Sequence, residues 1–222
     1  MKTVKCSVLM PAYNEEKTVG LCSAALFAHS AVSEVIVIAN NCTDDTVKVA
    51  LENGAKIIET EVKGKGHALK LGVMKVKEEF VVFYDSDVTN PSAVAIQQLL
   101  SGFTSDNIVL VKGEFDRSDH PGPVTDMLVK PTLRSVNHPA QEIKQPLSGF
   151  VAAKTSFLKL ITFPDDFGVD LAILLSVYKH GFGVAEVLLS DINHKQRPWS
   201  HYINMANEVA LVFKKFNIIQ GG

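Results

Sequence analysis

The sequence predicts an α/β domain built on a parallel, doubly wound sheet with helices on its faces. Three observations predict this class. The chain has 222 residues, a length that suits one large domain. In its first half, short apolar runs alternate with helical patterns. The run at 80–84, FVVFY, is apolar throughout, as in strands that are covered on both faces.

The first five elements alternate regularly. An apolar strand is expected at 4–10, and a helix follows from an Asn-Glu-Glu opening to about residue 29. A second strand, EVIVIA, occupies 34–39. Polar capping residues at 43–46 then begin a helix that stops at an Asn-Gly pair, and a short strand follows at 55–58.

A Lys-Gly-Lys-Gly loop at 63–66 leads into a helix expected at 67–76. The FVVFY strand follows and ends at Asp85-Ser86-Asp87. Another helix is expected after Pro91 and Ser92, which are good helix starters.

The second half is less regular, although no linker separates it from the first. Strands are expected at 108–115, 150–153 and 184–189, and helices at 124–133, 170–180 and 199–216. Residues 134–146 and 191–198 are expected to be loops. We therefore expect a single domain over 1–222, made of a first half at 1–90 and a second half at 91–222.

Composition narrows the classes of function. Hydrophobic residues make up 46% of the chain, charged residues 21%, and the net charge is -2. This excludes a disordered chain, and there is no basic excess to drive binding to nucleic acid. Three widely spaced cysteines suggest neither a disulfide framework nor a zinc site, and no apolar run is long enough to span a membrane. The expectation is a cytoplasmic protein without an integral membrane segment.

The Asp85-Ser86-Asp87 segment is the sharpest chemical signal. Residues i and i+2 of an extended segment point the same way, so both carboxylates face one spot at a strand end, where open parallel sheets bind ligands. Two carboxylates so close repel each other unless a cation lies between them, and oxygen ligands suit Mg²⁺ or Mn²⁺. The alternative is a solvated turn or helix cap.

Three further loops belong to the same edge of the sheet. The glycines of the 63–66 loop can let the backbone approach a phosphate, and the following helix start offers N–H groups; the alternative is an exposed basic turn. Residues 11–15 and 40–44 follow the first two strands and offer groups suited to a base and ribose. Turn and capping chemistry also accounts for part of both.

Two residues of the second half are ambiguous from the sequence alone. His194, in the 191–198 loop, is either a metal ligand or merely exposed. Asp170 is either a base or sugar-binding group, or the cap of the helix that follows it. A Ser/His/Asp triad has little support, because no Gly-x-Ser-x-Gly elbow is present.

Together, these segments resemble the GT-A-fold glycosyltransferases of the family-two type. The motifs are VLMPAYNEE, VIVIANNCTDDT, KGKGHAL and VVFYDSDVTNP in the first half. In the second half, VKGEF, PVTDMLVKPTL, QPLSGF, FGVDLAILL and NHKQRP resemble the glucosyl-3-phosphoglycerate and mannosyl-3-phosphoglycerate synthase subgroup. The implied fold is the Rossmann-like GT-A fold, with a mostly parallel central sheet flanked by helices. The resemblance also implies that 1–90 is a nucleotide-binding half and 91–222 an acceptor-binding half.

The resemblance implies roles for specific positions. The residues implied to bind the nucleotide-sugar are Pro11, Ala12, Tyr13, Glu15, Asn41, Cys42, Gly64, Lys65, Asp85 and Ser86. The implied metal ligands are Asp87 and His194, with Mg²⁺ or Mn²⁺ as cofactor. The implied catalytic set is Asp87, Asp170 near the sugar hydroxyls and the Leu147 carbonyl near the anomeric carbon. Gly122, Thr125, Lys195 and Arg197 are implied around the acceptor or phosphates.

The implied reaction is transfer of a hexose from a UDP-glucose or GDP-mannose type donor to a small acceptor such as 3-phosphoglycerate, with retention, by a homodimer. If the enzyme inverts instead, Asp170 is the candidate base. Pro123 departs from the pattern, because relatives that use phosphoglycerate carry an arginine there. The alternatives are a polyprenyl-phosphate sugar transferase, a sugar-1-phosphate nucleotidyltransferase and a binding protein without catalysis.

Overall fold

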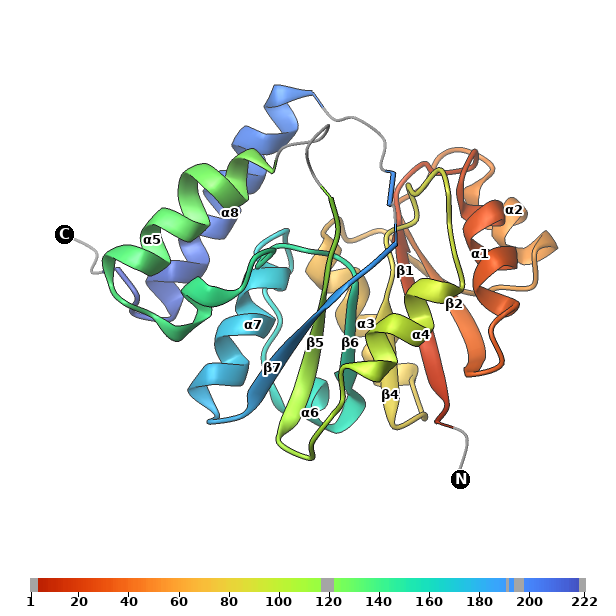
Figure 1. Ribbon diagram of the computed structural model, residues 1–222. Coiled ribbons are helices and arrows are strands. Elements are labelled where there is room, and N and C mark those ends of the chain that lie inside the picture. The colour runs from red at the N-terminus through yellow and green to blue at the C-terminus, as the bar shows by residue number, and fades with distance from the viewer. Residues whose placement is uncertain (1–3, 117–121, 191, 194–197, 220–222) are drawn as a thin grey trace.

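A computed structural model describes residues 4–116, 122–190, 192–193 and 198–219. A seven-stranded sheet runs through the molecule in the order β3-β2-β1-β4-β6-β5-β7 (Figure 1). Its strands are β1 (Cys6–Ala12), β2 (Val32–Asn40), β3 (Lys56–Thr60), β4 (Phe80–Phe83), β5 (Ile108–Glu114), β6 (Val151–Lys154) and β7 (Gly183–Leu188). The predicted mostly parallel sheet is confirmed.

One strand runs against the others. β6 pairs antiparallel with both β4 and β5, whereas the pairs of β1 with β2 and β4, of β2 with β3 and of β5 with β7 are parallel. The sheet therefore continues without a break from the first half of the sequence into the second. The carboxyl ends of β1, β2 and β4 meet at one edge.

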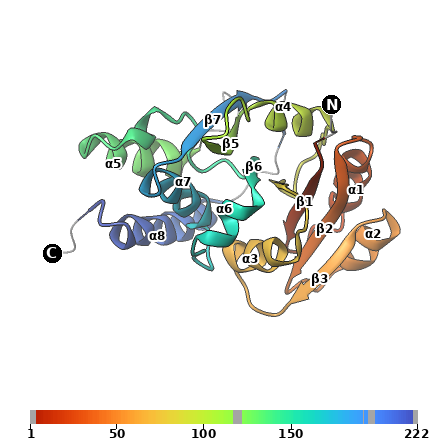
Figure 2. The same cartoon turned by 90° about the horizontal axis from the view of Figure 1, so that it is seen from below.

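The helices form two layers, one on each face of the sheet (Figure 2). One face carries α1 (Val19–Phe27), α2 (Thr46–Glu52) and α4 (Val94–Ser101). The other carries α3 (Lys65–Lys75), α6 (Thr155–Leu160), α7 (Val169–Lys179) and α8 (Trp199–Lys215). The π-helical turn η1 (Thr125–Val129) continues into α5 (Lys130–Ser135), and a 3-10 turn, η2 (Pro139–Glu142), follows.

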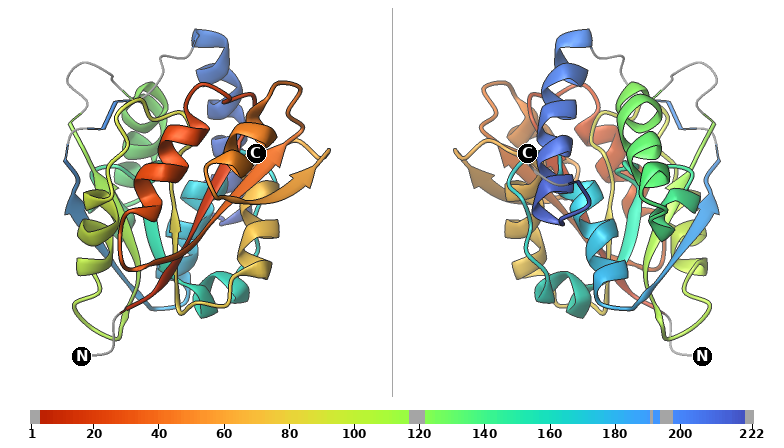
Figure 3. Two further views of the ribbon diagram at one scale, coloured as in Figure 1. Left: turned by 90° about the vertical axis from the view of Figure 1, so that its right-hand side faces the viewer. Right: turned by 90° about the vertical axis from the view of Figure 1, so that its left-hand side faces the viewer.

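The strands bury both of their faces, which explains their apolar runs. Leu9, Val81 and Phe83 belong to the core on the α3 and α7 side, whereas Val8 and Val82 belong to the core on the α1 and α4 side. Alternate side chains thus enter opposite cores. In the views of Figure 3, α8 and the η1–α5 segment lie beside each other outside α7.

The element predictions differ from the structure in instructive places. The first helix begins at Val19 rather than near residue 14, because Asn14 adopts a positive φ of 54° and residues 14–18 form a turn. The predicted loop at 134–146 contains η2, and α6 was missed. None of the described helices is long and apolar enough to cross a membrane.

Candidate active site

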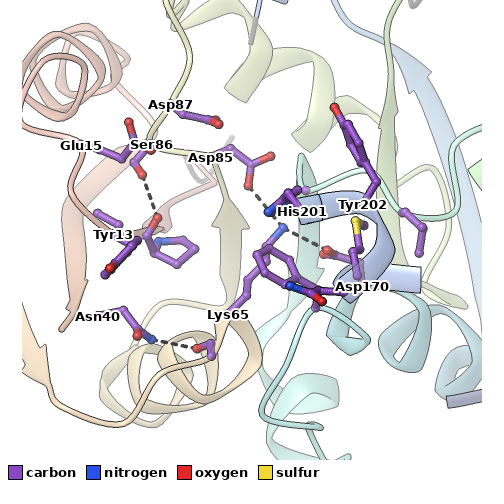
Figure 4. Close-up of a pocket in the computed structure, with 18 of the residues that line it drawn as sticks. Tyr13, Glu15, Asn40, Lys65, Asp85, Ser86, Asp87, Asp170, His201 and Tyr202 are labelled. Atoms are coloured by element: carbon purple, nitrogen blue, oxygen red, sulfur yellow. Dashed lines mark hydrogen bonds and ion pairs between the residues drawn. The ribbon is translucent and has the colours of Figure 1, made fainter. Parts of the chain in front are cut away.

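A cavity of about 940 Å³ opens where the parallel strands end. Figure 4 shows its wall, with Tyr13 and Glu15 after β1, Asp85 to Asp87 after β4, and Lys65 from α3. Asp170 closes the wall from α7 and His201 and Tyr202 from α8. Both halves of the sequence therefore contribute to one site, as ligand sites at the strand ends of open α/β sheets do.

Most of the predicted site residues lie in this wall. Those that line the cavity are Pro11, Ala12, Tyr13, Glu15, Gly64, Lys65, Asp85, Ser86, Asp87, Leu147 and Asp170. Asn41, Cys42, Gly122 and Thr125 are not part of its lining. His194, Lys195 and Arg197 lie outside the described residues.

The Asp85-Ser86-Asp87 segment presents its two carboxylates to the cavity. Ser86 turns the other way and its hydroxyl donates a 2.8 Å hydrogen bond to the Pro11 carbonyl, which ties the end of β4 to the end of β1. Asp85 lies against Gly149, where an added Cβ would come within 2.3 Å of the Asp85 Oδ2 atom. Only a glycine lets the 147–149 segment approach this carboxylate so closely.

The described lining of the cavity has more acidic than basic side chains. Its two lysines are Lys63 and Lys65, and its acidic residues are Glu15, Asp85, Asp87, Asp116 and Asp170. Within the described part of the chain, no group of three or more His, Cys, Asp and Glu side chains is arranged as a metal site. Asp85 and Asp87 offer carboxylate oxygens, which are ligands of the kind that divalent cations such as Mg²⁺ take.

Lys65 joins the two ends of the wall through ion pairs. Its Nζ lies 2.9 Å from Asp170 Oδ2 and 3.3 Å from Asp85 Oδ1. Burial lowers the pKa of Lys65, but the carboxylates of Asp170 and Asp85 outweigh this and hold the pKa above its usual value. Lys65 is therefore a fixed positive charge facing the cavity.

Asp170 is the most deeply buried acid of the wall. Burial raises the pKa of Asp170, although Lys65 and Lys112 act in the opposite direction. Its Oδ1 is buried and has no hydrogen-bond partner among the described residues. An orphaned carboxylate oxygen beside a cavity suits a donor such as a sugar hydroxyl.

The glycine loop before α3 has a different structural role from the one expected. A Cβ on Gly64 would lie 2.0 Å from the Asp165 carbonyl oxygen, and one on Gly66 would lie 1.8 Å from that of Pro164. The Gly66 and His67 N–H groups donate to the Asp166 and Asp165 carbonyls. The close backbone approach is thus to the 164–166 segment, and these helix-start donors are already used.

The 40–44 segment is hydrogen-bonded to the end of β1 and to the loop before α3. The Cys42 thiol donates to the Ala12 carbonyl at 3.3 Å, and the Asn40 side chain donates to the Gly64 carbonyl at 2.8 Å. Asp44 accepts hydrogen bonds from both the Thr46 N–H and its hydroxyl, whereas Asp45, the N-cap residue of α2 (Thr46–Glu52), makes no side-chain capping bond. It is Asn40, rather than Asn41 or Cys42, that reaches the cavity.

The predicted acceptor residues lie to one side. Thr125 lines a second cavity of about 500 Å³ that shares Phe115 and Asp116 with the first. Its lysines are already paired, Lys130 with Asp126 at 3.1 Å and Lys144 with Glu114 at 2.9 Å. Pro123 lines the main cavity and contributes no charge there.

An aromatic wall was missed by the sequence analysis. It consists of Phe167, Trp199, His201 and Tyr202, all of which line the cavity. The Phe167 and His201 rings lie 5.0 Å apart, and Tyr202 lies 5.6 Å from His201. The signal in the sequence was the cluster of three rings within four residues at the start of the last helix, directly after a polar loop.

Comparison with known proteins gives this site its class. A sheet whose strand ends carry a carboxylate pair, a buried lysine and a large cavity is suited to an enzyme acting on a nucleotide-diphosphate sugar. Residues 7–158 match the profile described as glycosyl transferase family 2, and the chain belongs to this family. It is a glycosyltransferase of the hexosyltransferase type, and its fold is the GT-A fold.

Glucosyl-3-phosphoglycerate synthases are among the curated proteins that are similar to this chain. The protein of that name from Mycolicibacterium smegmatis is 30% identical, over 91% of this chain and 74% of the relative. The one from Petrotoga mobilis is 29% identical, over 96% of this chain and 73% of the relative.

Solved structures lead to the same group. The crystal structure of glucosyl-3-phosphoglycerate synthase from Mycobacterium tuberculosis with Mn²⁺, UDP and glucosyl-3-phosphoglycerate matches with a TM-score of 0.90 and 28% identity. The match covers 99% of this chain and 82% of that chain. Another structure of the same protein, with Mg²⁺ and UDP, matches with a TM-score of 0.89 and covers 99% of this chain and 81% of that chain.

Proposed function

We propose that the protein transfers glucose from UDP-glucose to a phosphoglycerate-type acceptor, with Mg²⁺ or Mn²⁺ as cofactor. The observation that carries the proposal is the joining of Asp85, Lys65 and Asp170 by ion pairs at the wall of a cavity of about 940 Å³. The similar mycobacterial enzyme has been crystallised with Mn²⁺, UDP-glucose and phosphoglyceric acid. The likeness over nearly the whole of this chain supports the same substrate classes here.

The residues present fit the proposed cation. Asp85 and Asp87 offer oxygen ligands of the kind that Mg²⁺ and Mn²⁺ prefer, in a wall with more acidic groups than lysines. Asp87 would hold the metal, together with His194, and Asp85 would contact the ribose. A divalent cation supplies positive charge opposite the diphosphate leaving group.

Side chains and backbone groups of this chain would bind the nucleoside, stabilise the diphosphate and contact the donor sugar. Pro11 to Tyr13 and Glu15 would hold the nucleoside, and the fixed charge of Lys65 would stabilise the departing diphosphate. The buried, unpartnered Asp170 Oδ1 would accept a hydrogen bond from a donor-sugar hydroxyl. The Leu147 backbone, which lines the same cavity, would face the anomeric carbon.

We propose retention of the anomeric configuration. No described side chain is set up as a nucleophile of its own, and Asp170 Oδ2 is engaged by Lys65 at 2.9 Å. The acceptor hydroxyl would then attack from the leaving-group face and pass its proton to a phosphate oxygen. NMR of the product anomer is the test: an α-linked product from UDP-α-glucose supports retention, and a β-linked product would instead make Asp170 the base.

The substrate assignment is tested with a donor panel. Purified protein is given UDP-glucose, GDP-glucose, GDP-mannose or UDP-galactose with Mn²⁺, with and without 3-phosphoglycerate, and nucleoside diphosphate release is measured. We expect release that needs both UDP-glucose and the phosphoglycerate. Release with a neutral acceptor and none with phosphoglycerate would contradict the acceptor class, in keeping with Pro123 and the paired Lys130 and Lys144.

The single-domain organisation, the homodimer and the cytoplasmic location stay predictions. Light scattering coupled to size-exclusion chromatography tests the dimer, with twice the chain mass of 24.2 kDa as the expected result.

A further inference from the structure

A lysine is buried within the sheet, on the strand next to the β7 edge. Lys112 of β5 is 1% exposed and lies among the apolar residues of IVLVKGE. Leu110, two residues earlier, belongs to the core on the α3 and α7 side, so the Lys112 side chain points to that side as well. Its Nζ donates a 3.0 Å hydrogen bond to the Ser148 carbonyl.

Ser148 belongs to the segment that forms one wall of the active-site cavity. Its neighbours Leu147 and Gly149 both line the cavity, and Gly149 lies directly against the Asp85 carboxylate. Any shift of this segment towards the cavity therefore meets Asp85. The position of the 147–149 wall and the position of Asp85 are coupled.

The same segment is held to the sheet at its two ends. Before it, the Lys144 and Gln145 N–H groups donate to the Glu186 carboxylate of β7 at 2.9 and 3.2 Å. After it, the Gly113 N–H of β5 donates to the Phe150 carbonyl at 2.8 Å. Lys112 supplies the hydrogen bond between these two anchors, at the residue that separates Leu147 from Gly149.

Burial of the Lys112 ammonium group costs free energy, because the charge is removed from water. Burial lowers the pKa of Lys112 to about 8, while Asp170 acts in the opposite direction and Lys65 adds to the lowering. Glu186 of β7 and Asp85 after β4 also act on it, both raising the pKa. A methionine would fill a similar volume without this cost, so the contribution of the lysine lies in what its N–H group holds.

We propose that Lys112 is a positioning residue for the transfer: by holding the Ser148 carbonyl it fixes the 147–149 wall against Asp85 and so sets the geometry of the bound donor. This inference rests on the proposed function. Lys112 does not line the cavity and acts through the wall.

The test compares Lys112→Met with a matched control, Lys154→Met. Lys154 also donates to a backbone carbonyl, that of Asp106 at 2.9 Å, but it pairs with Phe80 at the opposite end of β4 from Asp85. Three quantities are measured: kcat at saturating substrates, the Kd of UDP with Mn²⁺ by calorimetry, and Tm. For Lys112→Met we expect kcat at least tenfold lower, Kd within threefold, and Tm unchanged or higher. Lys154→Met should keep kcat within twofold.

A lower kcat without a lower Tm separates positioning from a structural role, because the loss of a merely structural residue would lower both. Unchanged kcat in Lys112→Met, or a loss of kcat that follows a loss of Tm and of UDP binding, would overturn the proposal. A crystal structure of Lys112→Met gives a second readout that does not depend on turnover. A displaced 147–149 wall supports the proposal, and an unmoved wall overturns it. A wild-type protein that binds UDP with Mn²⁺ but transfers no hexose counts against the proposed function alone.

Discussion

At the scale of single residues, Asp87 offers the most direct test of the metal. Its carboxylate lines the cavity beside Asp85, and replacement by asparagine would remove the charge of the proposed metal ligand while leaving a side chain of the same shape. We expect Asp87→Asn to lower UDP release by about 1,000-fold or more, because charge on the leaving diphosphate would lose its counterion. The control is Asp106→Asn, an exposed aspartate beyond the other end of the sheet, which should behave as wild type. Near wild-type release from Asp87→Asn would remove Asp87 from the metal site.

Lys112 also makes a prediction about stability and pH. Burial lowers its pKa from 10.5 to about 8, so between these pH values the folded protein binds fewer protons than the unfolded chain. The free energy of unfolding therefore rises with pH across this window, by up to roughly 3 kcal/mol for this group. Denaturant unfolding of wild type and Lys112→Met at pH 7, 8, 9 and 10 measures it as a difference between the two proteins.

Other buried groups also change the free energy of unfolding in this pH range. Burial raises the pKa of both Cys6 and Cys22 to about 12, so these thiols lower stability as the pH rises above 9. Both proteins carry them, and the comparison cancels their effect. A difference in the free energy of unfolding between wild type and Lys112→Met that stays constant from pH 7 to 10 would contradict the buried-lysine account.

At the scale of elements, the docking of α3 depends on its glycines. Gly66 lies so close to the Pro164 carbonyl that an added Cβ would be 1.8 Å from its oxygen. We expect Gly66→Ala to cost roughly 1–3 kcal/mol of stability, because backbone must shift to admit the methyl group. Gly183→Ala is the control, since its Cβ would meet nothing closer than 3.3 Å. Calorimetric Tm values for the two variants decide the matter, and equal Tm values would refute the tight contact.

The elements also show where prediction from sequence succeeds. Three apolar strands, at whose carboxyl ends PAYNEE, ANN and DSD stand, were recognisable because burial on both faces produces a continuous apolar run. Their common site was predictable because parallel strands bring their carboxyl ends together. The direction of β6 was not recognisable, since a strand of four residues, three of them buried, carries no sign of which neighbours it pairs with or in which direction. The glycines of 63–66 suggested phosphate binding. In the structure they approach the backbone of the 164–166 segment, about a hundred residues further along the chain, and the local sequence around the glycines contains no signal of that contact.

At the scale of the whole molecule, the site is assembled from both halves of the chain. Lys65 and Asp170 are 105 positions apart in sequence and 2.9 Å apart in space. Their pairing, the aromatic wall and the Lys112 contact with Ser148 are tertiary features, so residue type and local spacing could not reveal them. The family resemblance predicted roles for individual residues, whereas the structure shows which residues form ion pairs and hydrogen bonds with one another.

Ligand binding at such a shared site should stabilise the molecule as a unit. We expect UDP alone to change Tm little, and UDP with Mn²⁺ to raise it by about 5–10 °C at a hundredfold excess over Kd. The cation would offset the repulsion between the diphosphate and the acidic wall formed by Asp85, Asp87 and their neighbours. Thermal shift measurements with and without EDTA check this. An equal rise with UDP in the presence of EDTA would contradict a metal-bridged diphosphate.

The reversed direction of β6 has a consequence for how such an enzyme can diversify. β4 leaves the sheet at the edge where β6 enters it, so the segment at 145–150 forms one wall of the cavity without belonging to β1, β2 or β4. Insertions or exchanges in the stretch between α5 and β6 can therefore reshape one side of the pocket while β1, β2 and β4 stay as they are.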